Sequence, residues 1–145
     1  MTEKDNVEAR VGVIIVTHAD YGSALLRAAE FILGAQSDCT SISIDVSQEV
    51  GETVTRLKEA VGRLDKGNGA IILTDMFGGT PTNLSLSLLA TSNVEVVTGV
   101  NLPMLLKVFG SRTMPLAQLA AEAGEAGGKG IIVAGQMLRS KTRNG

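Results

Sequence analysis

The sequence predicts an α/β fold in which a doubly wound, mainly parallel sheet carries helices on both faces. Short apolar runs rich in β-branched residues alternate along the chain with segments of helical periodicity, which is the pattern of βαβ units. The composition is 44% hydrophobic and 19% charged over 145 residues, which is typical of one globular domain with a buried core. No linker, repeat or low-complexity segment interrupts this pattern.

The first half of the chain predicts three strands and two helices. The run VGVIIVT (11–17) is expected to form a strand buried on both faces. A helix follows over 19–36, and Gly34 is its natural C-terminal stop. The next elements are a strand over 40–46, an amphipathic helix over 51–67 and a strand over 69–75.

The second half continues the alternation of helices and strands. Thr80 is expected to cap the next helix, with Pro81 at its first position, where a missing N–H costs nothing. The remaining elements are a strand over 93–99, a helix over 101–110, a helix over 115–124 and a last strand over 128–135. We therefore expect a single domain over residues 1–135, followed by a flexible basic tail over 136–145.

In open sheets of this kind, ligands bind beyond the carboxyl ends of the strands, where the winding direction reverses. Three loops lie at such ends. The first follows Thr17 and begins with His18, the second runs from Asp75 to Asn83, and the third runs from Gly99 to Asn101. These are also the three most unusual local sequences in the chain, so the site is expected where they meet.

His18 and Asp75 form the candidate catalytic pair. A lone histidine is more often a surface or capping residue, but the carboxyl edge of a central strand places His18 in the expected crevice. Neutral imidazole is a good nucleophile near neutral pH, and only one ring nitrogen can attack. If the strands that end at these residues are neighbours, Asp75 can accept a hydrogen bond from the other ring nitrogen and stabilise the positive ring that forms on attack.

The segment FGGTPTN predicts a cradle for an anion such as a phosphoryl group. Gly78 and Gly79 allow a sharp turn and close approach of a ligand, and the following helix start offers backbone N–H groups. Thr80 and Asn83 add side-chain donors. The alternative is a plain strand–turn–helix connection that needs no ligand. The segment lacks the GK[ST] ending of a nucleotide P-loop and the spacing of a dinucleotide fingerprint, and no GxSxG elbow is present.

The third loop, TGVNLPMLL, offers weaker evidence for a site. Gly99 and Asn101 are candidates for the site rim, although an asparagine before a helix more often bonds its own backbone. The apolar residues that follow are interpreted as core rather than as a surface for a partner; they are Met104, Leu105 and Val108.

Composition argues against several classes of function. A net charge of −2 lacks the basic excess that sequence-independent nucleic-acid binding requires. One cysteine, Cys39, permits no internal disulfide, and with one histidine and no carboxylate cluster no metal site is expected. No apolar run reaches the roughly 18–20 residues that span a bilayer, and the polar N-terminal segment is unlike a signal peptide. We therefore expect a cytoplasmic protein without direct membrane insertion.

Four separated blocks, in order, resemble the mannose-type IIA domain of the bacterial phosphoenolpyruvate-dependent sugar phosphotransferase system (PTS). They are VIIVTH, LLRAAEFILGAQ, TDMFGGTPTN and GVNLPMLL, which together span residues 11 to about 109. The resemblance implies that His18 accepts a phosphoryl group from the phosphocarrier protein HPr and passes it to a IIB domain, with Asp75 as its hydrogen-bond partner. It also implies that Gly78, Gly79, Thr80 and Asn83 surround the phosphoryl group and that Phe77 lies at the docking rim.

The resemblance further implies a homodimer whose last strand is antiparallel and crosses to the partner's sheet, and it implies no metal and no cofactor. A separate IIB protein and membrane IIC and IID components would complete the transport system. The chain departs from the family in having Ala19, Asp20 and Tyr21 after the histidine, where the family often has glycine first. These departures bear on which partners dock.

Three alternatives stay open from the sequence. The first is a regulator that is phosphorylated on the same histidine but acts by binding another protein. The second is the phosphotransfer subunit that serves dihydroxyacetone kinase, which fits DMFGGTP and GVNLP less well. The third is a flavodoxin-like module that binds an anion without chemistry. The sugar itself is not readable from the sequence.

Overall fold

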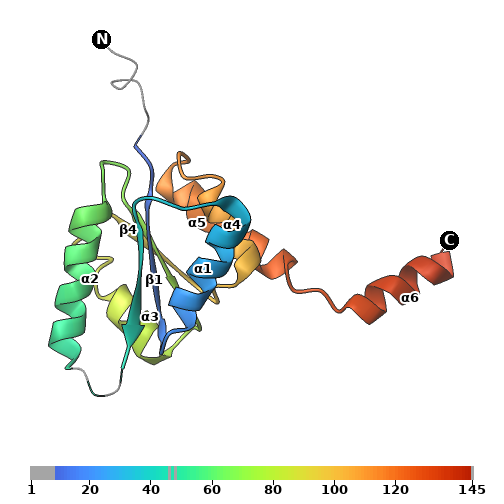
Figure 1. Ribbon diagram of the computed structural model, residues 1–145, viewed down its shortest axis with the longest axis horizontal. Helices are drawn as coiled ribbons and strands as arrows, with labels where there is room; N and C mark the ends of the chain where they lie inside the picture. Colours follow the sequence, from blue (N-terminus) through green and yellow to red (C-terminus); the bar gives the residue numbers. More distant parts are fainter. Residues whose placement is uncertain (1–8, 46, 48, 145) are drawn as a thin grey trace, which may run out of the picture.

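Four parallel strands and six helices make up the part of the chain that the computed structural model describes, residues 9–45, 47 and 49–144 (Figure 1). The strands are β1 (Gly12–His18), β2 (Cys39–Ile44), β3 (Ala70–Thr74) and β4 (Val94–Thr98). The helices are α1 (Tyr21–Leu33), α2 (Val50–Leu64), α3 (Gly79–Leu86), α4 (Leu102–Phe109), α5 (Leu116–Lys129) and α6 (Ala134–Asn144). Except near the C-terminus, each element lies close to its expected range.

The sheet has the strand order β2-β1-β3-β4, and every pairing is parallel. The chain first winds from β1 outward to β2 and then returns past β1 to β3 and β4, so the winding direction reverses between β1 and β3. The register pairs Val16 with Thr74, which brings the carboxyl ends of these two central strands together. The predicted doubly wound α/β fold is confirmed, and His18 and Asp75 follow the two strands that flank the reversal.

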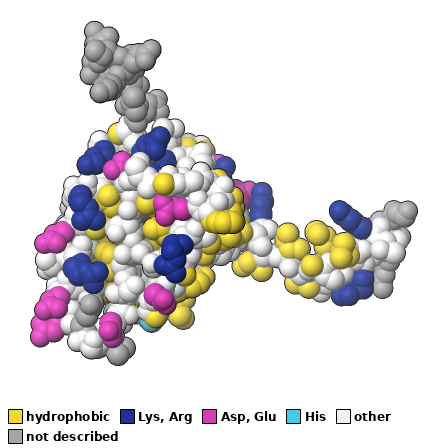
Figure 2. Space-filling model, viewed as in Figure 1, with side chains coloured by type: hydrophobic (Ala, Val, Ile, Leu, Met, Phe, Trp, Pro, Cys, Tyr) yellow, Lys and Arg dark blue, Asp and Glu magenta, His cyan; other side chains and the backbone are white. Residues whose placement is uncertain are grey.

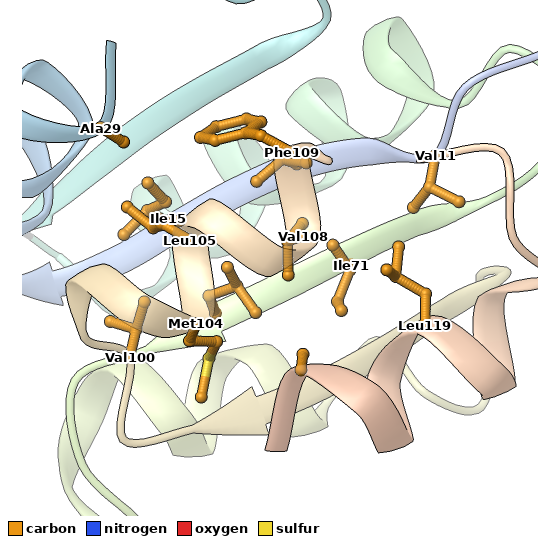
Figure 3. Close-up of a cluster of buried hydrophobic side chains, with 13 residues drawn as sticks. Val11, Ile15, Ala29, Ile71, Val100, Met104, Leu105, Val108, Phe109 and Leu119 are labelled. Carbon is orange, nitrogen blue, oxygen red and sulfur yellow. The ribbon is translucent and has the colours of Figure 1, made fainter. Parts of the chain in front are cut away.

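Helices cover both faces of the sheet, and each face has its own apolar core. Helices α1, α4 and α5 pack on one side and α2 and α3 on the other (Figure 1). β1 is buried over its first six residues because it is central and covered on both sides. In the core on the face covered by α1, α4 and α5, side chains from these three helices meet those of β1 and β3 (Figure 3). Met104, Leu105 and Val108 belong to this core, as predicted.

A buried arginine, which the sequence analysis did not single out, joins the N-terminal end of β1 to the α1–β2 loop. Arg112 is only 4% exposed. Its guanidinium donates to the backbone carbonyls of Val11, Ser37 and Asp38 and lies over the ring of Phe109. Burial lowers the pKa of Arg112 below its ordinary value, and the nearby charge of Asp38 opposes this shift without outweighing it. The hydrogen bonds to these carbonyls satisfy the donors of the buried guanidinium.

The C-terminal strand expected over 128–135 is not present, and this prediction was wrong for the single chain. Helix α5 continues through Lys129, residues 131–133 lie outside any helix or strand, and α6 begins at Ala134. A strand needs a hydrogen-bonded neighbour, and no described strand lies beside this segment, which projects from the domain (Figure 1). Its apolar side chains are exposed: Ile131 75%, Ile132 57% and Val133 62%.

Helix α6 occupies most of the segment expected as a tail. Apolar and basic side chains both lie on its surface, and Met137 and Leu138 are exposed (Figure 2). The predicted boundary at residue 135 and the flexibility of the tail stay predictions. Among the described residues, no helix is both long enough and apolar enough to cross a membrane.

Candidate functional site

The site lies at the reversal of the sheet, where His18 and Asp75 meet. His18 is the last residue of β1, and Asp75 directly follows β3. Oδ2 of Asp75 lies 2.8 Å from Nδ1 of the His18 ring and also accepts the backbone N–H of His18 at 2.9 Å. The carboxylate is therefore tied to both the main chain and the ring of the histidine. The predicted juxtaposition of these two residues is present.

The two partners differ in their exposure to solvent. The His18 side chain is 52% exposed, whereas that of Asp75 is 13% exposed. Burial raises the pKa of the Asp75 carboxyl, but hydrogen bonds from the backbone and ring of His18, together with the charge of the protonated ring, outweigh burial and hold it below its ordinary value. The carboxylate is therefore ionised at neutral pH, shielded, and able to act only on the ring beside it.

This ion-pair geometry determines which ring nitrogen is free to react. An ionised carboxylate only accepts hydrogen bonds, so Nδ1 of His18 must carry a hydrogen. In the neutral ring, Nε2 then holds the lone pair. A Cβ built on Gly79 would lie 3.6 Å from Nε2 and 3.5 Å from Cε1, so the backbone of the α3 start lies against the reactive edge of the ring. The absence of a side chain at Gly79 keeps that edge open.

Helix α3 begins two residues earlier than predicted. Gly78 is the N-cap and Gly79 the first residue, both with positive φ, 82° and 80°, which glycine adopts without strain. The expected Thr80 cap is therefore wrong, and no side chain caps this helix. Thr80 lies instead inside the first turn and lines the cavity beside His18. The two glycines take the place of a cap because the turn requires left-handed backbone.

A cavity of about 290 Å³ adjoins the ring of His18. Its lining is mixed, with apolar, hydroxyl and carboxylate side chains from the end of β2, the residue after it, α2 and α3: Ile44, Asp45, Val50, Thr53, Thr80 and Leu84. The sequence analysis named only Thr80 among these residues. Ile44 and Asp45 could have been found from the strand order, because β2 lies beside β1 and His18 pairs with Ile44. The site is thus an open hollow beside a half-exposed histidine.

The segment that contains this site is similar to proteins of a known family. The sequence model of the EIIA-man family, described as the PTS system fructose IIA component, matches residues 12–123. The chain belongs to this family. The match includes the histidine, the carboxylate and the glycine turn.

Curated relatives carry the names of sugar systems. The chain is 32% identical over 111 residues to the sorbose-specific EIIA component of Lacticaseibacillus casei, covering 75% of this chain and 80% of that protein. It is 28% identical over 127 residues to the mannose-specific EIIAB component of Escherichia coli (strain K12), covering 83% of this chain and 39% of that protein. The chain therefore spans well under half of the mannose-specific relative.

A solved structure agrees with the fold. The EIIA component from Streptococcus agalactiae superimposes with a TM-score of 0.79 at 27% identity, covering 87% of this chain and 98% of that one. The similarity extends over nearly the whole of that protein.

The other predicted site residues differ in their exposure and in the contacts that they make. Phe77 is 79% exposed in the loop between β3 and α3, beside the site, with Met76 at 55%. Asn83 is exposed on α3, one helical turn after Gly79. Gly99 has a positive φ of 86° and donates its N–H to the carbonyl of Thr74 at 2.9 Å. It therefore supports the loop that carries Asp75.

The Asn101 amide is not directed at the histidine. Its Oδ1 accepts the N–H of Met104 at 3.0 Å, which caps α4, and its Nδ2 donates to the carbonyl of Gly127 on α5 at 3.0 Å. The sequence left two roles open for Asn101, a place at the site rim or hydrogen bonding to the backbone. The structure shows its side chain hydrogen-bonded to the backbone. Its role at the site rim is therefore indirect.

Three threonines that the sequence analysis did not single out hold the site loops. Thr17 accepts the N–H of Gly22 at 2.7 Å and so caps α1, a task that the side chain of Asp20 does not perform. Thr74 and Thr82 form a buried hydroxyl pair on either side of the Asp75 loop. Thr17 and Thr74 each lie near the end of a buried strand, where an apolar residue would be usual, and this position is the sequence signal that could have identified them.

Among the described residues, no group of three or more metal-binding side chains is present.

Proposed function

We propose that His18 is the phosphoryl acceptor and donor of a PTS EIIA component, and that Nε2 is the atom that carries the group. The carrying observation is the 2.8 Å contact between Nδ1 and Asp75, which leaves Nε2 free at a half-exposed ring edge. Phospho-HPr would supply the phosphoryl group, and a separate IIB protein would receive it, on the way to membrane IIC and IID components. The protein would act in the cytoplasm as a phosphotransferase.

The transfer is an in-line displacement between two histidines. The lone pair of Nε2 forms the new P–N bond while the P–N bond to the donor histidine breaks and its electron pair returns to the donor ring. The hydrogen on Nδ1 stays in place, and Asp75 stabilises the positive charge that the ring acquires. The transition state of such transfers is loose, so positioning and charge stabilisation contribute most of the catalysis.

The start of α3 is proposed to hold the phosphoryl oxygens. Gly78 and Gly79 bring the backbone to the ring, and the N-terminal end of the helix favours negative charge there. Thr80 and Asn83 would add side-chain donors from the first and second turns. These four residues therefore surround the group, and the exposed Phe77 would contact each carrier protein as it docks. Both interfaces should be small and short-lived because each partner must leave.

The homodimer stays part of this proposal. Three exposed apolar residues in succession, 131–133, are unusual on a monomer surface, and adding them as an antiparallel strand to a second copy would bury them. Light scattering of the full chain should give twice the monomer mass, and Ile132→Asp should reduce it. A monomeric wild-type chain at micromolar concentration would contradict this part of the proposal.

The central test uses phosphoenolpyruvate, enzyme I and HPr with the full chain. Intact mass should show one added phosphoryl group that is labile in acid, and His18→Ala should show none. The chain has a single histidine, so no other residue can form a phosphohistidine. Omitting HPr from the wild-type reaction is the control for direct transfer.

The outcomes separate the proposed function from its alternatives. Absence of an adduct on folded wild-type protein would contradict phosphotransfer and favour an anion-binding module. Formation of the adduct without onward transfer to a IIB protein would favour a regulator. Onward transfer to IIB supports the transport role, and the sugar then follows from the membrane components rather than from this chain.

A further inference from the structure

We propose that Thr82 is a positioning residue for Asp75. It acts through the hydroxyl of Thr74, the residue before Asp75, and through the carbonyl of Met76, the residue after Asp75. Thr82 lies on α3 and is fully buried, seven residues after the carboxylate in the chain. It does not touch His18 in any described contact. Its hydroxyl instead contacts the residue before Asp75 and the residue after it.

The direction of this hydrogen-bond chain follows from the atoms involved. The carbonyl of Met76 only accepts, so the Thr82 hydroxyl donates its one hydrogen to it, at 2.6 Å. The 2.7 Å contact with the hydroxyl of Thr74 must then run the other way, with Thr74 donating to Thr82. Both threonines are fully buried, so water does not compete for these groups.

The segment between β3 and α3 has few other restraints. The carbonyl of Thr74 accepts the N–H groups of Gly99 and Val100, each at 2.9 Å, which holds the near side of Asp75. On the far side, the described hydrogen bond to the peptide between Met76 and Phe77 comes from Thr82. Without that hydroxyl, the carbonyl of Met76 would be left with no described donor. Asp75 would then be fixed on one side only.

The position of Asp75 matters because one oxygen performs its whole task. Oδ2 accepts both hydrogen bonds from His18, and Oδ1 is buried with no partner. A small rotation of the loop would therefore lengthen the contact with Nδ1, and the backbone N–H of His18 is the other described hydrogen bond that holds this oxygen in place. The ring of His18 would then populate the tautomer in which Nε2 carries the hydrogen, and that tautomer cannot attack phosphorus. Thr82 thus controls the fraction of reactive imidazole.

The experiment compares Thr82→Val with Thr82→Ser in the full chain. Valine keeps the branched shape without the hydroxyl, whereas serine keeps the hydroxyl. The fraction of the Nδ1–H tautomer is measured from ring ¹⁵N–¹H correlations of unphosphorylated protein, and the rate of phosphorylation by phospho-HPr is measured separately. Thr82→Val should show a mixed tautomer and a rate lower by up to about a hundredfold, because a displacement of about 1 Å is enough for such a loss. Thr82→Ser should match wild type.

Ser85 provides a matched control on the same helix. Its hydroxyl is also fully buried and donates to a backbone carbonyl, that of Pro81, at 2.7 Å, but it does not contact the Asp75 loop. Ser85→Ala should lower stability while leaving the tautomer and the rate unchanged. If folded Thr82→Val keeps both the wild-type tautomer and the wild-type rate, Thr82 is only structural and the proposal is overturned.

A further measurement on wild type tests the same hydrogen bond without any substitution. If Thr82→Val does not fold, wild type decides, because a Thr82 hydroxyl bonded to Met76 exchanges slowly and gives its own proton resonance. A hydroxyl proton averaged with water would overturn the proposal. The inference rests on the proposed role of His18, but the tautomer is read without any phosphoryl group. Failure of wild type to accept phosphate would therefore defeat the proposed function and still leave the comparison of Thr82 variants decisive.

Discussion

The loops that follow β3 and β4 leave the same edge of the sheet, yet their polar side chains serve different ends. The Asp75 carboxylate, after β3, binds the last residue of β1 and supports its half-exposed ring. The Asn101 amide, after β4, caps its own helix and bonds to α5. A polar residue at the carboxyl end of a strand is thus available for chemistry only when the local backbone does not already satisfy it.

Glycines account for part of this difference. The β3–α3 loop uses Gly78 and Gly79 to begin its helix, so no side chain is needed as a cap and the helix start stays open toward His18. The β4–α4 loop has Gly99 for its turn but begins α4 with an asparagine cap. The first arrangement leaves the donors of a helix start available for an anion. The second consumes one of them internally.

The largest effect that would test this contrast is expected for Asp75→Asn. An amide can donate as well as accept, so it no longer selects the Nδ1–H tautomer, and it cannot balance the positive ring. The rate of phosphorylation by phospho-HPr should fall by about a hundredfold or more. Rapid-quench measurement with labelled phosphoenolpyruvate gives the rate.

Asp20→Asn is the matched control for the loss of charge. Asp20 is exposed two residues after His18, and its side chain makes no capping hydrogen bond. Removing its charge should leave the rate unchanged or raise it slightly, because a negative group near a phosphoryl site is mildly unfavourable. Equal losses in the two variants would mean that overall charge, not the contact with His18, governs the reaction.

Substitution of Asn83 should affect mainly the phosphorylation rate, whereas substitution of Asn101 should affect mainly the stability. Asn83→Ala should lower the phosphorylation rate about tenfold or more, because it removes a proposed donor to the phosphoryl group. It should change stability little because Asn83 is exposed. Asn101→Ala should leave the rate near wild type but lower the free energy of unfolding by about 1–2 kcal/mol, because it removes a helix cap and the bond to Gly127. Urea unfolding and rate measurements on both variants check this crossing pattern.

The dependence of stability on pH should report the Asp75 contact. The folded-state pKa of Asp75 is lowered, so its contribution to stability is fully present above the unfolded pKa of about 3.9 and is lost as pH falls through the folded value. Wild type should therefore lose more unfolding free energy than Asp75→Asn between neutral pH and acid below about pH 4. Parallel curves for the two proteins would show that the contact contributes nothing to stability.

The smallest expected effect concerns the loop after β1. Ala19 has a positive φ of 49°, a conformation that is costly for alanine and free for glycine. Ala19→Gly should raise the free energy of unfolding by about 0.5 kcal/mol. The matched substitution Ala24→Gly, at an exposed position within α1, should lower it by about 0.5–1 kcal/mol. The same sign in both variants would contradict this account of the backbone.

The sheet and the contact between His18 and Asp75 were predictable because both depend on strongly patterned sequence. Buried parallel strands are continuous apolar runs, and the rule on strand ends then places His18 and Asp75 at one edge. The polar anchors were less accessible. Arg112 and Thr82 belong to residue types that usually lie on surfaces, and their burial depends on partners distant in the chain or on the exact loop path.

The error at the C-terminus has a different cause. GKGIIVAG has the composition of a strand, but a strand forms only beside a neighbour, and the sequence pattern does not say whether that neighbour belongs to the same chain. In the single chain the glycines instead fall at the end of α5 and at the start of α6. The strand composition of 128–135 is therefore not sufficient to form a strand without a neighbouring strand.

Identification of the phosphorylated ring nitrogen tests the central claim most directly. The chain would be phosphorylated through HPr on ¹⁵N-labelled histidine, and the ring nitrogen that couples to ³¹P would be assigned by NMR. The hydrogen bond between Nδ1 and Asp75 predicts that phosphorus is attached to Nε2 of His18 and that Nδ1 keeps its hydrogen. Phosphorus on Nδ1 would contradict the role given to Asp75, because that nitrogen would have had to leave the carboxylate to react.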